Sequence, residues 1–369
     1  MKLNKIDFAT EELGSYVPGF PEVLQPSSAL SHRDLVKEIE FNRDALRAKI
    51  SQDGALLLRG CPVRTVFEFR SLMDALGIPS CRPGKYFGEV ARDATGPDTM
   101  VATIVPKDLV LGPHNEGDYW YKQPEFICFF CEYSDCTFGQ TPLIHGANVA
   151  RALPKDLMAK LENRSLKTEY VFRGRRESLR GGKKQKRNSW PRVFDTRERA
   201  KVESILDSRD DVTYHWNADD SLYIRVTTSI FWTHPVTGER CFRAMRYCDI
   251  KNVQFMMTHF ARHQMPYFRF LLAQWGMNSV FWLMNRSWIR HEKYSWKTSF
   301  LEGPPLTDLE KKRLTRIFFD HCTIFRWHPR DVLIVDNIKA AHGRLNVDSS
   351  RKIHVFLSEY IEQGKSNGA

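Results

Sequence analysis

The stretch "DVLIVDNIKAAHGR", residues 331–344, joins a run of apolar β-formers to a turn and a histidine. Its first half has the length and composition of a buried strand, and Asp336-Asn337 is a pair typical of turns. Two more β-patterned runs flank it, "TIFRWHP" at 323–329 and "RKIHVFLSEYI" at 351–361. The end of the chain therefore predicts a succession of strands, with His342 just past one of them.

Similar patterns continue toward the N-terminus. Three further segments are rich in β-formers or alternate polar and apolar residues, and they predict strands: "GALLLRG" at 54–60, "PEFICFFCEY" at 124–133 and "SLYIRVTTSIFWTHPVTGERCFRAM" at 221–245. "FGQTPLIHG", at 138–146, predicts a turn and another strand. Helical spacing marks residues 31–50, 65–77, 147–162 and 306–322. Strands dominate without regular βαβ alternation, so the prediction is a mainly β fold with flanking helices, of the α+β class.

Length and composition limit the class of protein. The 369 residues are 42% hydrophobic, which suits a globular chain of one large domain or two ordinary ones. No apolar run is long enough for a transmembrane helix, and the first twenty residues do not resemble a secretory signal. We therefore expect a cytoplasmic protein that does not bind membranes.

The eight cysteines fit that compartment, where they should be thiols. "CFFCEYSDC" contains a C-x-x-C pair, Cys128 and Cys131, followed by Cys136. A zinc site would need a fourth ligand and turn residues around each pair. Because the flanks are apolar, buried strand thiols are the preferred interpretation.

The net charge of +11 is concentrated in one segment. Residues 173–192, "RGRRESLRGGKKQKRNSWPR", hold nine Lys or Arg against one Glu, a local charge of +8. This loop insertion is interpreted as a solvated segment with lid character. Alternatively, it docks an acidic partner, such as a carrier protein with a tethered amino acid, or a phosphorylated substrate. No aromatic stacking platform accompanies the charges, so no nucleic-acid partner is expected.

A histidine and a glutamate lie two positions apart in "LGPHNEGDYW", residues 111–120. In a strand, or in the extended rim beside it, residues i and i+2 point to one face, so His114 and Glu116 can approach one point. With His342 they make two histidines and one carboxylate, the facial triad of non-haem Fe(II) oxygenases. Taken alone, an H-x-E pattern is weak and is more often a surface pair in a loop.

Two further residues support an oxygenase. Arg351 follows His342 by nine positions and can form a bidentate pair with a carboxylate, such as the distal one of 2-oxoglutarate. The hydroxyl of Thr141 can donate to the same carboxylate.

At this point the sequence resembles a known family. "PHNEGDYW", "QPEFICFFC" and "FGQTPLIHGANVARALP", together with "WHPRDVLIVDNIKAAHGR" and "SRKIHVFL", are similar to TauD/TfdA-type Fe(II)/2-oxoglutarate-dependent dioxygenases. The likeness runs over roughly residues 50–360 and is greatest to the H-x-E branch, the SyrP-like and clavaminate-synthase-like members. It implies a double-stranded β-helix, or jelly-roll, core. The whole chain, 1–369, would be one domain with a basic loop at about 173–192 and a helical insertion at about 251–320.

The resemblance also assigns roles to residues. It implies that His114, Glu116 and His342 bind Fe(II), that Arg351 binds 2-oxoglutarate and that Thr141 assists. The interval from His342 to Arg351 is shorter than in some members, so Arg344 or Lys352 can share the role or take it. Iron, 2-oxoglutarate and O₂ together supply the oxidising chemistry.

The function that the resemblance implies is C–H activation on an amino-acid-like small molecule in a secondary-metabolite pathway. The outcome would be hydroxylation, desaturation or cyclisation, and the substrate would be free or tethered to a carrier protein. Two alternatives stay open: a catabolic dioxygenase of a small organic acid, and a non-catalytic jelly-roll binding module. The oligomeric state has no signature in the sequence.

Overall fold

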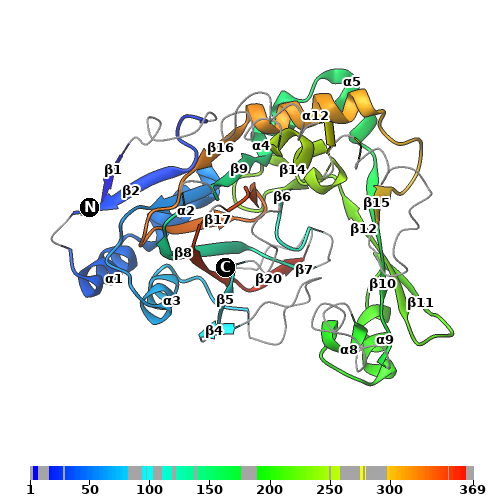
Figure 1. Ribbon diagram of the computed structural model, residues 1–369, viewed down its shortest axis with the longest axis horizontal. Coiled ribbons are helices and arrows are strands. Elements are labelled where there is room, and N and C mark those ends of the chain that lie inside the picture. The colour runs from blue at the N-terminus through cyan, green and yellow to red at the C-terminus, as the bar shows by residue number, and fades with distance from the viewer. Residues whose placement is uncertain are drawn as a thin grey trace.

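The computed structural model of the protein (Figure 1) describes most of the 369 residues. The described ranges are 3–6, 16–27, 30–81, 94–96, 98–102, 110–118, 122–136, 139–175, 189–248, 251–257, 275–276, 279, 297–347 and 349–362. No helix in these ranges is long and apolar enough to cross a membrane.

The largest sheet has eight strands in the order β1-β2-β3-β17-β8-β19-β5-β4. Neighbours are antiparallel except β2 and β3, which run parallel. The strands, in chain order, are β1 (Leu3–Lys5), β2 (Glu22–Pro26), β3 (Ala55–Leu58), β4 (Ala94–Gly96), β5 (Thr99–Val101), β8 (Phe126–Ser134), β17 (Val332–Asp336) and β19 (Arg351–Leu357). The central strands are apolar on both faces, as expected for a sheet covered on both sides.

A smaller antiparallel sheet packs against the large one and carries the strand with His342. Its order is β16-β9-β18-β6, with β6 (Leu111–His114), β9 (Thr141–His145), β16 (Cys322–Phe325) and β18 (Ala340–Arg344). Leu143 and Phe325 of this sheet share one buried cluster with Phe129, Leu333 and Val355 of the large sheet. The two sheets therefore enclose a common core.

Helices cover the outer faces of both sheets (Figure 1). The next residues along the large-sheet strands, such as Leu56, Phe130 and Ile334, point the opposite way and pack under α1 (His32–Phe41), α2 (Arg43–Asp53) and α3 (Val66–Ala75). Ile144 and Ile324 of the small sheet pack under α4 (Gly146–Ala152), α5 (Lys155–Leu161) and α12 (Asp308–Asp320). The result is four layers, helix–sheet–sheet–helix.

A third sheet lies to one side of these layers, at the right in Figure 1. Its order is β11-β12-β10-β15, with β10 (Ser165–Phe172), β11 (Val212–Trp216), β12 (Leu222–Ser229) and β15 (Lys297–Phe300). The short helices α8 (Trp190–Val193) and α9 (Arg199–Asp207) pack on it through their own apolar cluster. Two strand pairs and a 3₁₀ turn also belong to the described fold: β13 (Phe231–Thr233) with β14 (Arg240–Phe242), β7 (Lys122–Pro124) with β20 (Tyr360–Glu362), and η2 (Met245–Cys248). Residues 251–257, just after η2, are helical.

The mainly β prediction with flanking helices is confirmed, but two predicted helices are each divided in two. The 31–50 helix breaks at Asn42, whose side chain donates to the Glu38 carbonyl at 2.7 Å and ends α1. The 147–162 helix breaks before Pro154, which lacks the N–H that a continuous helix needs. The 306–322 helix begins as predicted, at a capping box of Thr307 and Glu310.

The two predicted insertions are only partly described. Of the basic 173–192 loop, residues 176–188 lie outside the described residues, and Arg173 and Ser189 at its ends pair in a parallel bridge. Of the 251–320 segment, expected to be helical, residues 258–274 and 280–296 also lie outside them. That segment contributes a strand as well, β15, which pairs with β10.

Candidate metal and co-substrate site

The two histidines meet because their strands are neighbours. β18 lies between β9 and β6, and the register places His342 directly opposite His114. Residues that face each other across an antiparallel pair have side chains on one side of the sheet. Their ring centroids are 4.6 Å apart, and Phe129 of the large sheet packs edge-on against His342 at 5.3 Å.

Glu116 reaches the same point by a different route from the one predicted. It is not in an extended segment: β6 ends at His114, and Asn115–Asp118 form a turn in which Gly117 has a positive φ of 70°. Asn337 fixes this turn, because its Oδ1 accepts from the Glu116 N–H at 2.7 Å and its Nδ2 donates to the Glu116 carbonyl at 2.9 Å. Strand alternation therefore does not explain the H-x-E geometry.

The three side chains place one possible ligand atom each within 4.8 Å of one another. Both histidine Nε2 atoms face the same carboxylate oxygen of Glu116, at 3.9 Å from His114 and 3.8 Å from His342. All three residues are buried. Among the described residues, no other group of three His, Cys, Asp or Glu side chains converges in this way.

The protonation of His114 suits a metal ligand. Its Nδ1 donates to the Gly112 carbonyl at 2.9 Å, which leaves the Nε2 lone pair directed at Glu116. Burial, and next the nearby Arg246 cation, hold the pKa of His114 below its usual value. A neutral imidazole beside a carboxylate is the state that binds a divalent ion.

A pocket opens beside the histidines, and the residues predicted for 2-oxoglutarate line it. Thr141, Arg344 and Arg351 share it with His114 and His342. Burial and, next, the neighbouring Arg344 cation lower the pKa of Arg351 to about 10, so Arg351 is still a cation at neutral pH. Arg344 is a cation too, because a guanidinium keeps its proton in proteins. Two adjacent cations in a half-closed pocket favour an anionic ligand.

Trp327 orients the hydroxyl of Thr141. The indole Nε1, which can only donate, lies 2.8 Å from Thr141 Oγ1. The hydroxyl must accept this bond, so its own proton is left to donate into the pocket. Trp327 is buried and also lines the pocket. Lys352, the other residue expected to be able to share the role of Arg351, is not among the residues that line the pocket and pairs with Glu132 at 2.9 Å.

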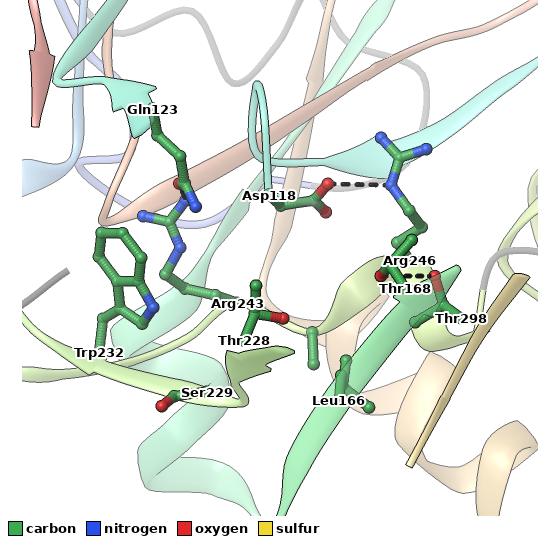
Figure 2. Close-up of a pocket in the computed structure, with 11 residues that line it drawn as sticks. Asp118, Gln123, Leu166, Thr168, Thr228, Ser229, Trp232, Arg243, Arg246 and Thr298 are labelled. Carbon is green, nitrogen blue, oxygen red and sulfur yellow. Dashed lines mark hydrogen bonds and ion pairs between the residues drawn. The ribbon is translucent and has the colours of Figure 1, made fainter. Parts of the chain in front are cut away.

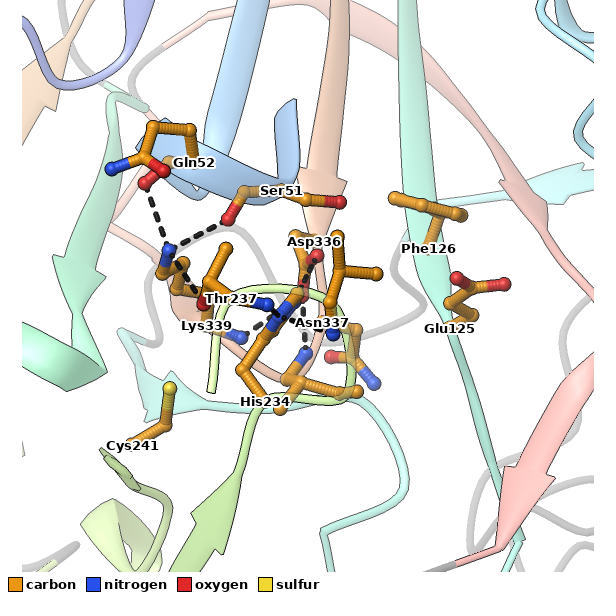
Figure 3. A network of polar contacts seen from close by, with 12 residues as sticks. Ser51, Gln52, Glu125, Phe126, His234, Thr237, Cys241, Asp336, Asn337 and Lys339 are labelled. Atoms are coloured by element: carbon orange, nitrogen blue, oxygen red, sulfur yellow. Dashed lines mark hydrogen bonds and ion pairs between the residues drawn. The ribbon is translucent and has the colours of Figure 1, made fainter. Parts of the chain in front are cut away.

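The turn between β17 and β18 is anchored more heavily than a simple turn (Figure 3). The Asp336 carboxylate accepts from His234 Nε2 at 2.8 Å and from the Ile338 and Lys339 amides. The ammonium of Lys339, fully buried, donates to the Ser51 and Gln52 carbonyls and pairs with Glu239. The "HPVTGE" turn, 234–239, thus holds the loop that positions Asn337.

Other polar residues near the site have structural roles. Asn115 is buried and donates to the Asn337 and Ala340 carbonyls at 2.8 and 3.0 Å. His145 caps α4 by accepting from the Asn148 N–H. Cys128 and Cys131, in β8, are buried strand thiols as expected, and Cys136 is a buried thiol just past that strand.

Comparison with known proteins places this geometry in context. Residues 22–268 match the family model described as "Taurine catabolism dioxygenase TauD, TfdA family". This range covers His114, Glu116 and Thr141 and ends before His342, Arg344 and Arg351. The chain is 21% identical over 346 residues to the dapdiamide synthesis protein DdaC of Enterobacter agglomerans. This alignment covers 94% of this chain and 93% of DdaC.

A shorter match and two solved structures are also similar. A clavaminate synthase-like protein of Arabidopsis thaliana is 27% identical over 132 residues, 34% of this chain and 39% of that protein. AAD-2, solved with Mn(II) and N-oxalylglycine, has a TM-score of 0.51 at 12% identity, covering 98% of this chain and 99% of AAD-2. PvcB of Pseudomonas aeruginosa has a TM-score of 0.50 at 13% identity, covering 91% and 85%. At these identities, the structures show the shared fold.

Proposed function

The chain belongs to the TauD, TfdA family of dioxygenases, and from that premise we propose that it oxidises a C–H bond of an amino-acid-like small molecule in a secondary-metabolite pathway. The family's cofactor is Fe(II), with 2-oxoglutarate and O₂ as co-substrates. The observation that carries the proposal is the convergence of His114, Glu116 and His342 within 4.8 Å. We assign these three side chains as the iron ligands.

The donor set fits ferrous iron. Two imidazole nitrogens and one carboxylate on one side of a metal leave the remaining positions to other ligands, as in the two-histidine, one-carboxylate oxygenases. When bound, iron with 2-oxoglutarate and O₂ supplies the oxidising power for an unactivated C–H bond. The role of the protein is to hold the metal ligands in place. The Asn337 side chain does this for Glu116 through two hydrogen bonds to the Glu116 backbone.

The co-substrate is assigned to the pocket beside the histidines. Arg351 is the proposed partner of the distal carboxylate of 2-oxoglutarate, with the Thr141 hydroxyl as a second donor. Arg344 lies in the same pocket and adds a second positive charge. Because the two arginines carry the charge opposite to that of a dicarboxylate, they would draw it in and orient its keto acid end toward the metal.

We also propose that the two packed sheets form the double-stranded β-helix of the family, and that 1–369 is one domain. The assignment to a secondary-metabolite pathway rests on DdaC, a dapdiamide synthesis protein that matches nearly the full length of the chain. The family description itself names taurine catabolism, so a small sulfonate or other organic acid is the alternative substrate.

The test is spectroscopic first and catalytic second. Anaerobic addition of Fe(II) and 2-oxoglutarate should produce a visible metal-to-ligand charge-transfer band, and aerobic turnover should release succinate. His114→Ala should abolish both, whereas His321→Ala, a histidine at the end of α12 outside the pocket, should change neither. If the wild type shows no band and no succinate, the enzyme assignment fails and the binding-module alternative gains weight. A screen of free amino acids against taurine and small acids then separates the two substrate classes.

A further inference from the structure

A second pocket is lined by Asp118, the last residue of the turn that contains Glu116 (Figure 2). Its walls come from the third sheet, with Thr168 of β10, Thr228 of β12 and Thr298 of β15, and from the segment around η2. Asp118, Gln123, Trp232, Arg243 and Arg246 complete its polar and aromatic lining. None of these residues belongs to the proposed iron or 2-oxoglutarate site.

Arg243 supplies a buried cation to this pocket. The residue is only 3% exposed. One guanidinium nitrogen, Nη2, donates to Gln123, and the group stacks over the Trp232 ring at 4.2 Å. Within the described residues no carboxylate pairs with Arg243, and Nη1 is buried with no hydrogen-bond partner. Burial lowers its pKa to about 10, so it is still a cation at neutral pH.

A buried cation that touches no carboxylate is costly, and the usual solution is an anion in direct contact. The nearby charges that stabilise Arg243, Asp118 first among them, act on it without forming an ion pair. Gln123 and Trp232 hold the guanidinium in place without neutralising it. The geometry thus leaves Nη1 as a donor for an anionic group that enters the pocket.

Asp118 supplies a buried carboxylate to the same pocket. Its carboxylate faces the pocket, with the side chain 5% exposed and Oδ1 accepting from Arg246 Nε at 2.9 Å. The other oxygen, Oδ2, is buried, and no described group donates to it. The pocket therefore presents one unmatched donor on a cation and one unmatched acceptor on an anion.

We propose that this pocket binds the zwitterionic head of a free α-amino acid, with its carboxylate on Arg243 and its ammonium on Asp118. The inference rests on the proposed function and narrows its substrate class. It places the head group close to the metal ligands, because Asp118 is two residues past Glu116 and two residues of chain span at most about 7 Å. The side chain of the substrate would then extend toward the iron from a fixed head.

One consequence concerns tethered substrates. An aminoacyl group in thioester linkage to a carrier has no free carboxylate, so it cannot pair with Arg243. Binding a tethered aminoacyl group would leave the buried Arg243 guanidinium without a carboxylate partner. A site rejects an analogue most strongly when one of its buried polar groups is left unpaired in this way. The substrate expected from the structure is the free amino acid.

The test uses the wild-type holoprotein and matched ligands. Proteinogenic and common non-proteinogenic amino acids are screened for stimulated succinate release. The best is then compared with its α-amide, its N-acetyl derivative and its pantetheine thioester. Each analogue should lower kcat/KM on the order of 100-fold, the size expected when a buried charged partner loses its mate. In the anaerobic iron–2-oxoglutarate complex, the amino acid should shift the charge-transfer band at concentrations where the analogues do not.

Variants assign each half of the head group to its residue. Arg243→Met should lower turnover of the amino acid on the order of 100-fold. The kcat/KM values for the amino acid and for its α-amide should then become nearly equal. Asp118→Asn should remove most of the discrimination against the N-acetyl derivative. Arg240→Met is the matched control, because Arg240 lies on β14 three positions away and pairs with Glu162 outside the pocket. The band with 2-oxoglutarate alone, and thermal melting, report whether each variant is folded.

Three outcomes would overturn the proposal: equal stimulation by acid and amide, stimulation by the thioester alone, or no band shift with any free amino acid. Each of these differs from failure of the proposed function, which would remove the band itself from the wild type.

Discussion

The two pockets beside the Glu116 turn are built from different parts of the molecule. The pocket of Arg351 and Thr141 is made by strands of the two packed sheets, whose register fixes each side chain. The pocket of Arg243 and Asp118 is made by the third sheet, η2 and a turn. The first therefore depends on the core of the fold, and the second on segments added around it. Changes in the first should affect 2-oxoglutarate with every substrate, and changes in the second should affect the substrate alone.

The largest effect is expected from a substitution in the first pocket, at Arg351. Arg351→Met should weaken 2-oxoglutarate binding on the order of 100-fold or more, because a buried charge pair is lost in a pocket that has little solvent to replace it. The dissociation constant is measured by anaerobic titration of the charge-transfer band. The preference for an amino acid over its amide should be unchanged once 2-oxoglutarate saturates.

Lys352→Met is the control for Arg351, since Lys352 is the next residue and pairs with Glu132 instead. Arg344→Met tests the remaining alternative: if it weakens 2-oxoglutarate binding more than Arg351→Met does, the roles of the two arginines are exchanged. A loss of amino-acid discrimination in either variant would mean that the two pockets do not act separately.

A smaller effect is expected at Asn337, which neither pocket contains and which holds Glu116. Asn337→Ala removes both hydrogen bonds to the Glu116 backbone, so the affinity for Fe(II) should fall by roughly 10- to 100-fold, as for other groups that orient a metal ligand. The measurement is iron titration at saturating 2-oxoglutarate. Asn217→Ala, in the turn before β12, is the control. Unchanged iron affinity together with a lower melting temperature would show that Asn337 serves folding alone.

The difference between the pockets also explains what the sequence could and could not predict. Strands such as β3, β8 and β17 are continuous apolar runs, and burial on both faces leaves a strong local pattern. His114 and His342 were recognised by residue type beside such runs. Their direct pairing depends on β18 lying next to β6, a contact between segments more than 200 residues apart that no local pattern encodes.

Glu116 and Arg243 are two residues whose placement could not be predicted from local sequence patterns. The H-x-E spacing was interpreted as strand alternation, but a turn held by Asn337 brings Glu116 into place. Arginine is usually exposed, so the residue type alone gives no reason to place Arg243 in the interior. Only the arrangement of the third sheet and Trp232 around it reveals a buried cation. The sequence also gives no sign that Gly343 is required. In the structure, a Cβ at this position would lie 2.8 Å from the Leu111 carbonyl and would push β6, with His114, out of place.

The smallest effect is expected at the basic loop, and it bears directly on the two substrate classes. Replacing Lys183, Lys184, Lys186 and Arg187 by Gln removes four of the loop's positive charges. If the substrate is a free amino acid held by Arg243 and Asp118, its kcat/KM should change by less than about twofold, the usual range for substitutions that touch no binding or core group. A carrier-docking loop predicts the opposite: turnover of a carrier-bound aminoacyl substrate would fall steeply with the loss of charge and with added salt. Measuring both substrates with the same variant decides between them, because a strong effect confined to the carrier-bound substrate would assign the loop to docking and contradict the zwitterion pocket.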